Sequence, residues 1–183
     1  FPYCAEKIGE KNRLYAMERQ RKDIELMAPA GSFESLEAAF QGGADSVYFG
    51  LGRLNMRARS AFNFTPGDLP EILSRTRENH CRSYLTMNTV LYDHELGMIR
   101  ELIDRAAGEG VDAIIASDLS VIDYAFKRGV DVHISTQLNI SNLDAVKFYS
   151  RFAGTMVLAR ELDLEKVGHI ARGIEVEDVR GPT

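Results

Sequence analysis

The stretch that decides the fold is residues 131–142, DVHISTQLNISN. Apolar and polar residues alternate in its first half, as in a strand, so that Val132 and Ile134 share one face. His133 and Ser135 fall on the other face, and the second half changes to residues that start turns and cap helices. Polar side chains at the end of a buried strand are costly to bury unless they meet a ligand or one another. The pattern therefore predicts the floor of a binding site, with a half-exposed antiparallel strand as the alternative.

Length and composition predict a folded globular domain without a strong charge bias. The chain has 183 residues, 45% of them hydrophobic, and a net charge of −5. This charge argues against an overall basic surface for nucleic acid, although it leaves room for a local basic patch. No apolar run approaches the roughly 20 residues of a membrane span, and no secretory signal stands at the start. With two cysteines far apart in sequence, Cys4 and Cys81, we expect a reducing cytoplasm and no membrane partner.

Residues 1–22 differ from the rest of the chain. Lysine and arginine are frequent there, and apolar residues are too sparse for a strand. We expect a weak helix or a loose N-terminal arm, either native or foreign to the domain. The folded domain is expected over residues 23–183.

From residue 24 onward, short apolar strands alternate with amphipathic helices about six times. Ser32, Asp118 and Asp163 stand where they can cap the helices that follow. Ser141 is placed much like the first residue of a capping box. Strands joined by helices form a parallel sheet with the helices outside. The expected strands are residues 24–28, 46–50, 83–88, 113–117, 131–137 and 155–159.

Two closures of such a sheet compete, a TIM-like (β/α) barrel and an open doubly wound sheet. A complete barrel has about 250 residues, whereas this α/β chain holds about six βα units. We favour an incomplete TIM-like barrel whose last units are missing from this chain. The two strand edges left open would invite pairing with another chain, so we expect self-association.

Binding residues in parallel α/β folds lie at the carboxyl ends of the strands. Collecting those ends selects amides, hydroxyls and two arginines, and few nucleophiles. Arginine at a strand end suits a planar carboxylate or phosphate, which it binds with two parallel hydrogen bonds. We therefore expect an anionic small molecule as ligand, while a salt bridge on a solvated rim is the alternative for the second arginine. The substrate-binding candidates are Asn55, Arg57, Asn88, Asp118, Gln137, Asn139, Arg160 and Glu161.

Sequence motifs for a defined chemistry are incomplete. Gly50-Leu-Gly52 begins like a dinucleotide fingerprint but lacks the third glycine, and no Gly-x-Ser-x-Gly elbow or His-Glu-x-x-His zinc helix occurs. His133 is a weak candidate for a catalytic base, with a structural role as the alternative. Ser135 shares its face but stands roughly 6–7 Å away, too far for direct proton transfer. The sequence predicts no metal site and leaves the catalytic residues unassigned.

Five blocks of sequence, taken in order, resemble the collagenase-like peptidase family U32. They are ELMAPAGSFESLEAAFQGGADSVYFG, YLTMNT, IIASD, HISTQLNISN and VLAREL. The resemblance extends from Asp23 to about Ile174 and is strongest to the branch of tRNA uridine hydroxylation and collagenase-like proteins. Family members are similar in having a TIM-like barrel as their N-terminal domain, which implies barrel closure here. Their roles carry over only as substrate-pocket candidates, at strand-end residues already named.

The resemblance also implies cofactors. Several relatives are oxygen-independent hydroxylases of a tRNA wobble uridine, of ribosomal RNA or of a ubiquinone precursor. They are associated with prephenate and with a 4Fe-4S cluster held by four cysteines, which follow the sixth repeat near a Gly-Ala-Leu-Cys block. This chain does not contain that block, and Cys4 and Cys81 match none of the cluster ligands. We therefore expect no cluster in this fragment, which should be inactive alone.

Three functions remain open for the parent protein. The first is prephenate-linked hydroxylation of a tRNA uridine, which makes tRNA a partner. It is favoured because the site bears arginine and the chain lacks a protease constellation. The second is collagenase-like proteolysis, and the third is a non-catalytic scaffold.

Overall fold

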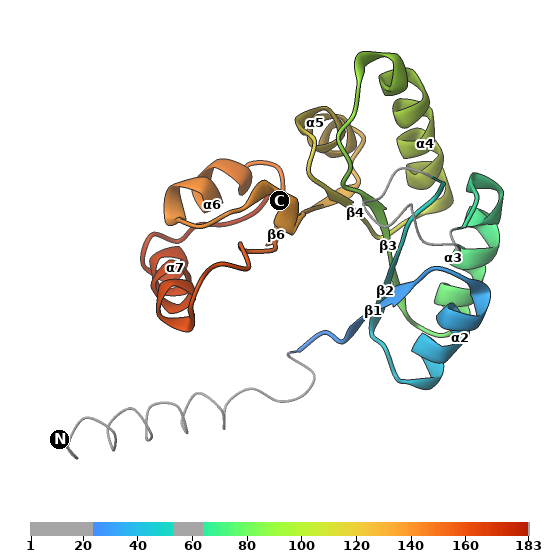
Figure 1. Ribbon diagram of the computed structural model, residues 1–183, viewed down its shortest axis with the longest axis horizontal. Coiled ribbons are helices and arrows are strands. Elements are labelled where there is room, and N and C mark those ends of the chain that lie inside the picture. The colour runs from blue at the N-terminus through green and yellow to red at the C-terminus, as the bar shows by residue number, and fades with distance from the viewer. Residues whose placement is uncertain (1–23, 53–63, 183) are drawn as a thin grey trace.

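The structure is a computed structural model that describes residues 24–52 and 64–182. The predicted N-terminal arm and the loop candidates Asn55 and Arg57 lie outside these ranges. Within them, strands and helices alternate along the chain, and the helices form an arc around the sheet (Figure 1).

The six strands form one sheet in which spatial order follows sequence order. Each strand pairs in parallel with the next, from β1 to β6. Such a sheet of βα units curls on itself, and the curled half-barrel of Figure 1 confirms the predicted incomplete TIM-like barrel. The strands are β1 (Met27–Ala30), β2 (Ser46–Phe49), β3 (Arg82–Met87), β4 (Ala113–Ala116), β5 (Asp131–Ile134) and β6 (Thr155–Met156).

Several strand ends differ from the prediction. β1 begins at Met27, and the backbone N–H of Leu26 just before it donates to the Asp45 carboxylate at 2.7 Å. β5 ends at Ile134, where a 3-10 turn replaces the second half of the predicted strand. β6 is only two residues long, although Leu158 makes one further parallel bridge. Among the described residues β1 and β6 each pair on one side only, and the expected self-association stays a prediction.

The helices begin at side-chain caps that the sequence largely predicts. Ser32, Asp118 and Asp163 each accept a backbone N–H at the start of a helix, as expected. The predicted cap Ser141 is wrong, because the extended residue Asn142 precedes the helix and its Oδ1 accepts from the N–H of Ala145 at 2.8 Å. No helix in the described part of the chain is both long and apolar enough to cross a bilayer. The helices are α2 (Phe33–Gln41), α3 (Leu69–Glu78), α4 (Leu96–Glu109), α5 (Leu119–Lys127), α6 (Leu143–Tyr149) and α7 (Leu164–Val176), with 3-10 turns η2 (Pro66–Asp68), η3 (Asp93–Glu95) and η4 (Thr136–Leu138).

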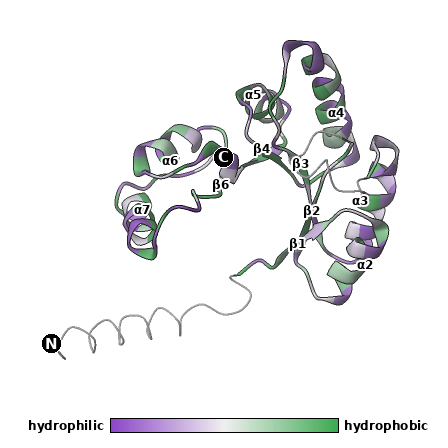
Figure 2. Cartoon of the chain, in the orientation of Figure 1, coloured by the Kyte–Doolittle hydropathy of each residue, from purple (hydrophilic) through white to green (hydrophobic). Residues whose placement is uncertain are grey.

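The core lies between the convex side of the sheet and the helices. Alternate strand residues point there and are almost fully buried, among them Val47, Phe49, Leu85, Ile114 and Ile134. Fully burying a side chain of this size contributes about 1.5–3 kcal/mol. Each helix carries both hydrophobic and hydrophilic residues, as expected of helices with only one face in the core (Figure 2).

The intervening strand residues point to the concave side. The register aligns Tyr84 with Ala113, and Thr86 with Ile115 and His133, so these side chains share one face. This face is far more polar than the convex one. It therefore positions the candidate site.

Candidate functional site

The mouth, which we define as the carboxyl end of the sheet around Asn88, Asp118 and Ser135, brings two of the predicted strand ends into contact. The Asn88 side-chain N–H donates to Ser135 Oγ at 3.2 Å and so links β3 to β5 across β4. Ser135 is buried, and its Oγ also accepts the N–H of Gln137 at 3.4 Å. The polar residues that the sequence places at these strand ends therefore form some of their hydrogen bonds with one another.

The Asp118 side chain caps the helix that follows it, α5. One carboxylate oxygen accepts the backbone N–H of Ser120 at 2.8 Å and the Ser120 hydroxyl at 2.6 Å. A carboxylate at this position stabilises the positive end of the helix dipole. Substrate binding by Asp118 stays a prediction beside this capping role.

The remaining described candidates are exposed and follow the carboxyl ends of β5 and β6. Gln137 belongs to η4 rather than to the strand, and Asn139 ends that turn with a left-handed φ of 49°. Arg160 and Glu161 form a turn after β6. Among the described residues Arg160 has no ion-pair partner, and Asp163 pairs with Lys166 instead. The structure thus places these side chains at the expected end of the sheet, and their binding roles stay predictions.

A second polar group occupies the concave face, and it surrounds the sequence candidate His133 with three residues that sequence reasoning missed. The Tyr84 hydroxyl donates to Glu25 Oε1 at 2.5 Å, and the Arg82 guanidinium contacts Glu25 Oε2 at 2.6 Å. The Tyr84 ring meets the His133 ring edge to face, with centroids 4.6 Å apart. We call Glu25, Arg82, Tyr84 and His133 the concave-face array.

Burial and charge shift the pKa values of the array. Burial lowers the pKa of His133, although the charges of Glu25 and Asp131 oppose the shift. Burial and the Glu25 carboxylate raise the pKa of Tyr84. Burial would raise the pKa of Glu25, but the hydrogen bond from the Tyr84 hydroxyl and the charge of Arg82 outweigh it, so the pKa is lowered. At neutral pH the array therefore combines a carboxylate, a guanidinium, a phenol and a neutral imidazole.

Part of the array could have been found from the sequence. In β3, Arg82, Tyr84 and Thr86 alternate with residues that face the core, which marks them as one face. Nothing in the sequence indicates Glu25, because it lies 59 residues from Tyr84. Only the curl of the sheet brings the two together.

Thr86 adds a buried hydroxyl to the concave face. The residue is 8% exposed, and its Oγ1 has no hydrogen-bond partner among the described residues. An unpaired buried hydroxyl costs about 1–3 kcal/mol. A bound ligand would recover part of that free energy.

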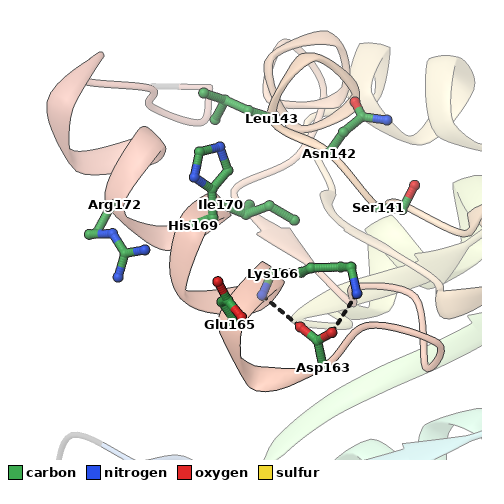
Figure 3. Close-up of a pocket in the computed structure, with 9 residues that line it drawn as sticks. All are labelled: Ser141, Asn142, Leu143, Asp163, Glu165, Lys166, His169, Ile170 and Arg172. Atoms are coloured by element: carbon green, nitrogen blue, oxygen red, sulfur yellow. Dashed lines mark hydrogen bonds and ion pairs between the residues drawn. The ribbon is translucent and has the colours of Figure 1, made fainter. Parts of the chain in front are cut away.

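A groove of about 450 Å³ opens between α6 and α7 (Figure 3). Its charged side chains are two acids, Asp163 and Glu165, and two bases, Lys166 and Arg172. The first acid and the first base pair with each other. Because the charges nearly balance, the groove shows no preference for an anion. It is lined by Ser141, Asn142, Leu143, Asp163, Glu165, Lys166, His169, Ile170 and Arg172.

The cysteine in the described part of the chain does not suit an iron–sulfur cluster. Cys81 is buried just before β3, at the end of the sheet opposite the mouth. Burial and the charges of Asp45 and Asp112 raise the pKa of its thiol to about 11, so the thiolate that binds a metal is disfavoured. The described residues also contain no group of three or more histidine, cysteine or acidic side chains placed to hold a metal ion.

The fold and the mouth define a TIM-barrel-like α/β domain with its candidate site at the carboxyl ends of the strands. The family model described as Peptidase family U32 matches residues 31–179. The chain therefore belongs to peptidase family U32.

Relatives and a solved structure agree with this assignment. The chain is 54% identical over 160 residues to a protein named collagenase from Porphyromonas gingivalis, covering 87% of this chain and 39% of that protein. It is 32% identical over 154 residues to tRNA hydroxylation protein P from Helicobacter pylori, covering 82% of this chain and 36% of that protein. The solved U32 peptidase Mk0906 superposes with a TM-score of 0.68 at 12% identity, over 81% of this chain and 64% of its own, and supports the fold. The chain thus spans less than half the length of these two curated relatives.

Proposed function

We propose that the whole protein hydroxylates a uridine of tRNA without molecular oxygen, in a reaction linked to prephenate. The observation that carries this proposal is the hydrogen bond from the Asn88 amide to Ser135 Oγ at 3.2 Å. In this contact the hydroxyl oxygen of the buried Ser135 accepts from a side-chain amide and is not paired with a base.

A serine protease needs a base within hydrogen-bond reach of its nucleophile. Among the residues that the structure describes, both partners of Ser135 Oγ are N–H donors, from Asn88 and Gln137, and an N–H cannot take up its proton. His133, two residues earlier, packs its ring on Tyr84. The arrangement supports a mouth that binds polar groups over one that activates serine.

Prephenate carries carboxylates, which a guanidinium binds with two parallel hydrogen bonds. Arg160 is exposed after β6 and has no ion-pair partner among the described residues, so it is the residue we assign to this anion. The family's 4Fe-4S cluster would be held by cysteines other than Cys4 and Cys81. A tRNA substrate also implies a cytoplasmic location.

The proposal is tested by mass spectrometry of tRNA from a deletion strain complemented with variants of the whole protein. We expect hydroxylated wobble uridine to disappear on deletion, to return with the native protein and to fall with Arg160→Ala. Arg151→Ala is the matched control, because that arginine lies over Phe148 on the outer layer. Unchanged wobble uridine in the deletion strain would refute the proposal.

Collagenase-like proteolysis is the second candidate, because the relative named collagenase is more than half identical to this chain. It predicts that the purified whole protein cleaves gelatin after contaminating proteases are removed. Loss of that cleavage in Ser135→Ala and His133→Ala, with tRNA unchanged by deletion, would replace the first proposal. A protein inactive in both assays would favour the scaffold function.

A further inference from the structure

The concave-face array connects strands that are not neighbours in the sheet, across its concave face. Glu25 precedes β1, Tyr84 lies in β3, and His133 lies in β5. Tyr84 fills the space between the other two, since its hydroxyl reaches Glu25 at 2.5 Å and its ring meets His133 at 4.6 Å. Tyr84 is 3% exposed and makes both contacts at once.

We propose that Glu25 is a positioning residue for His133, which it orients through Tyr84 and whose proton uptake it favours across the concave face. His133 is then a proton acceptor on the concave face. An O–H or N–H of a bound ligand gives its proton to an imidazole nitrogen, leaving the ligand anionic and the ring cationic. The new charge faces the Glu25 carboxylate.

The charges around His133 fix the sign of the coupling. Glu25 from the segment before β1 and Asp131 from β5 favour the charged ring, and Arg82 from β3 opposes it. Tyr84 is neutral, because burial and Glu25 raise its pKa. Removing the Glu25 charge therefore makes protonation of His133 harder.

Because the two carboxylate oxygens of Glu25 have different partners, substitutions can remove its charge or its contact with Tyr84 separately. Arg82 binds Oε2, which leaves Oε1 to accept the Tyr84 hydroxyl. Glu25→Gln keeps the size of the side chain and removes its charge, whereas Tyr84→Phe keeps the ring against His133 and removes the hydroxyl. Tyr124→Phe is a matched control, because the Tyr124 hydroxyl also contacts a carboxylate, Asp104, but on the helical layer.

The first test follows the His133 resonance by NMR in the whole protein labelled at histidine Cε1 and assigned with His133→Gln. We expect a lower pKa for His133 in Glu25→Gln, a smaller decrease in Tyr84→Phe and no change in Tyr124→Phe. Circular dichroism spectra and urea unfolding first establish that each variant is folded like the native protein. An unmoved His133 titration in folded Glu25→Gln would overturn the proposal, whichever activity the protein has.

The second test measures the pH profile of the activity that the whole protein displays, tRNA modification or gelatin cleavage. We expect His133→Gln to lower kcat about a hundredfold. Glu25→Gln should shift the acid limb of kcat/KM, which reports the free protein, to lower pH by the same amount as the NMR titration. A full rate in His133→Gln, or an acid limb that stays in place while the NMR pKa moves, would overturn the role of His133 as proton acceptor.

Discussion

The two faces of the same six strands differ sharply. On the convex side, Val47, Leu85 and Ile114 are completely buried under the helices. On the concave side, one residue along each strand, the register places Tyr84 and His133, whose rings contact each other. Tyr84 also donates a hydrogen bond to Glu25, which forms an ion pair with Arg82. Strand alternation alone separates the two sets.

The difference assigns stability to one face and chemistry to the other. The convex face gains free energy from the apolar area that it buries. The concave face holds a hydroxyl, Thr86 Oγ1, without a partner among the described residues, and a half-buried histidine whose pKa is lowered by burial. Groups that are costly to bury are expected where a ligand binds.

The largest effect is expected from Ile114→Ala on the convex face. Ile114 is 0% exposed, and its truncation should lower the free energy of unfolding by about 2–5 kcal/mol. Ile115→Ala, on the concave face and only half-buried, is the control and should cost less. Urea denaturation of both variants measures the difference, and equal losses would contradict the division between the faces.

A smaller effect is expected from acidification. The pKa of His133 is lowered in the folded state from an ordinary value of 6.5, so the unfolded state binds more protons as the pH falls through that value. The contribution of the neutral His133 to the free energy of unfolding should therefore be complete above about pH 6.5 and should decrease as the pH falls below that value. His133→Gln should flatten this part of the pH dependence in urea titrations, whereas substitution of the exposed His94 should not. Parallel curves for the native protein and His133→Gln would exclude a buried neutral imidazole.

Asp118 separates helix capping from binding at the mouth. Asp118→Ala should cost about 1 kcal/mol of stability through the lost cap of α5, whereas Asp118→Asn keeps a good cap. Asp123→Ala on the same helix removes only an exposed pair with Lys127 and should cost less than about 1 kcal/mol. If Asp118→Asn is stable yet loses activity, the carboxylate also serves the ligand. Full activity of that variant would restrict Asp118 to capping.

The smallest change in stability is expected from Thr86→Val on the concave face. Valine has nearly the same shape and removes a hydroxyl without a partner among the described residues, so stability should stay within about 1 kcal/mol or rise. Ser83→Ala is the contrasting control, because Ser83 Oγ donates to Asp112 at 2.7 Å and its loss should cost about 1 kcal/mol. A clear destabilisation by Thr86→Val would show that the hydroxyl is satisfied in solution. Loss of activity without loss of stability would assign it to the ligand.

The sequence predicted most of the fold and less of the site. The number of repeats, the parallel sheet and the caps at Ser32, Asp118 and Asp163 are confirmed, because periodicity and capping depend on neighbouring residues. The expected cap at Ser141 fails by one residue, which local pattern resolves poorly. Strand β5 also ends earlier than its alternation indicates, since a 3-10 turn takes over at Thr136.

The sequence by itself determined an incomplete barrel of six βα units and the end at which its polar residues gather. The tertiary structure decided which of those residues meet. The Tyr84 contact with Glu25 and the Asn88 contact with Ser135 join residues 59 and 47 positions apart. Neither contact follows from local pattern, because both depend on the register between strands and on how tightly the sheet curls.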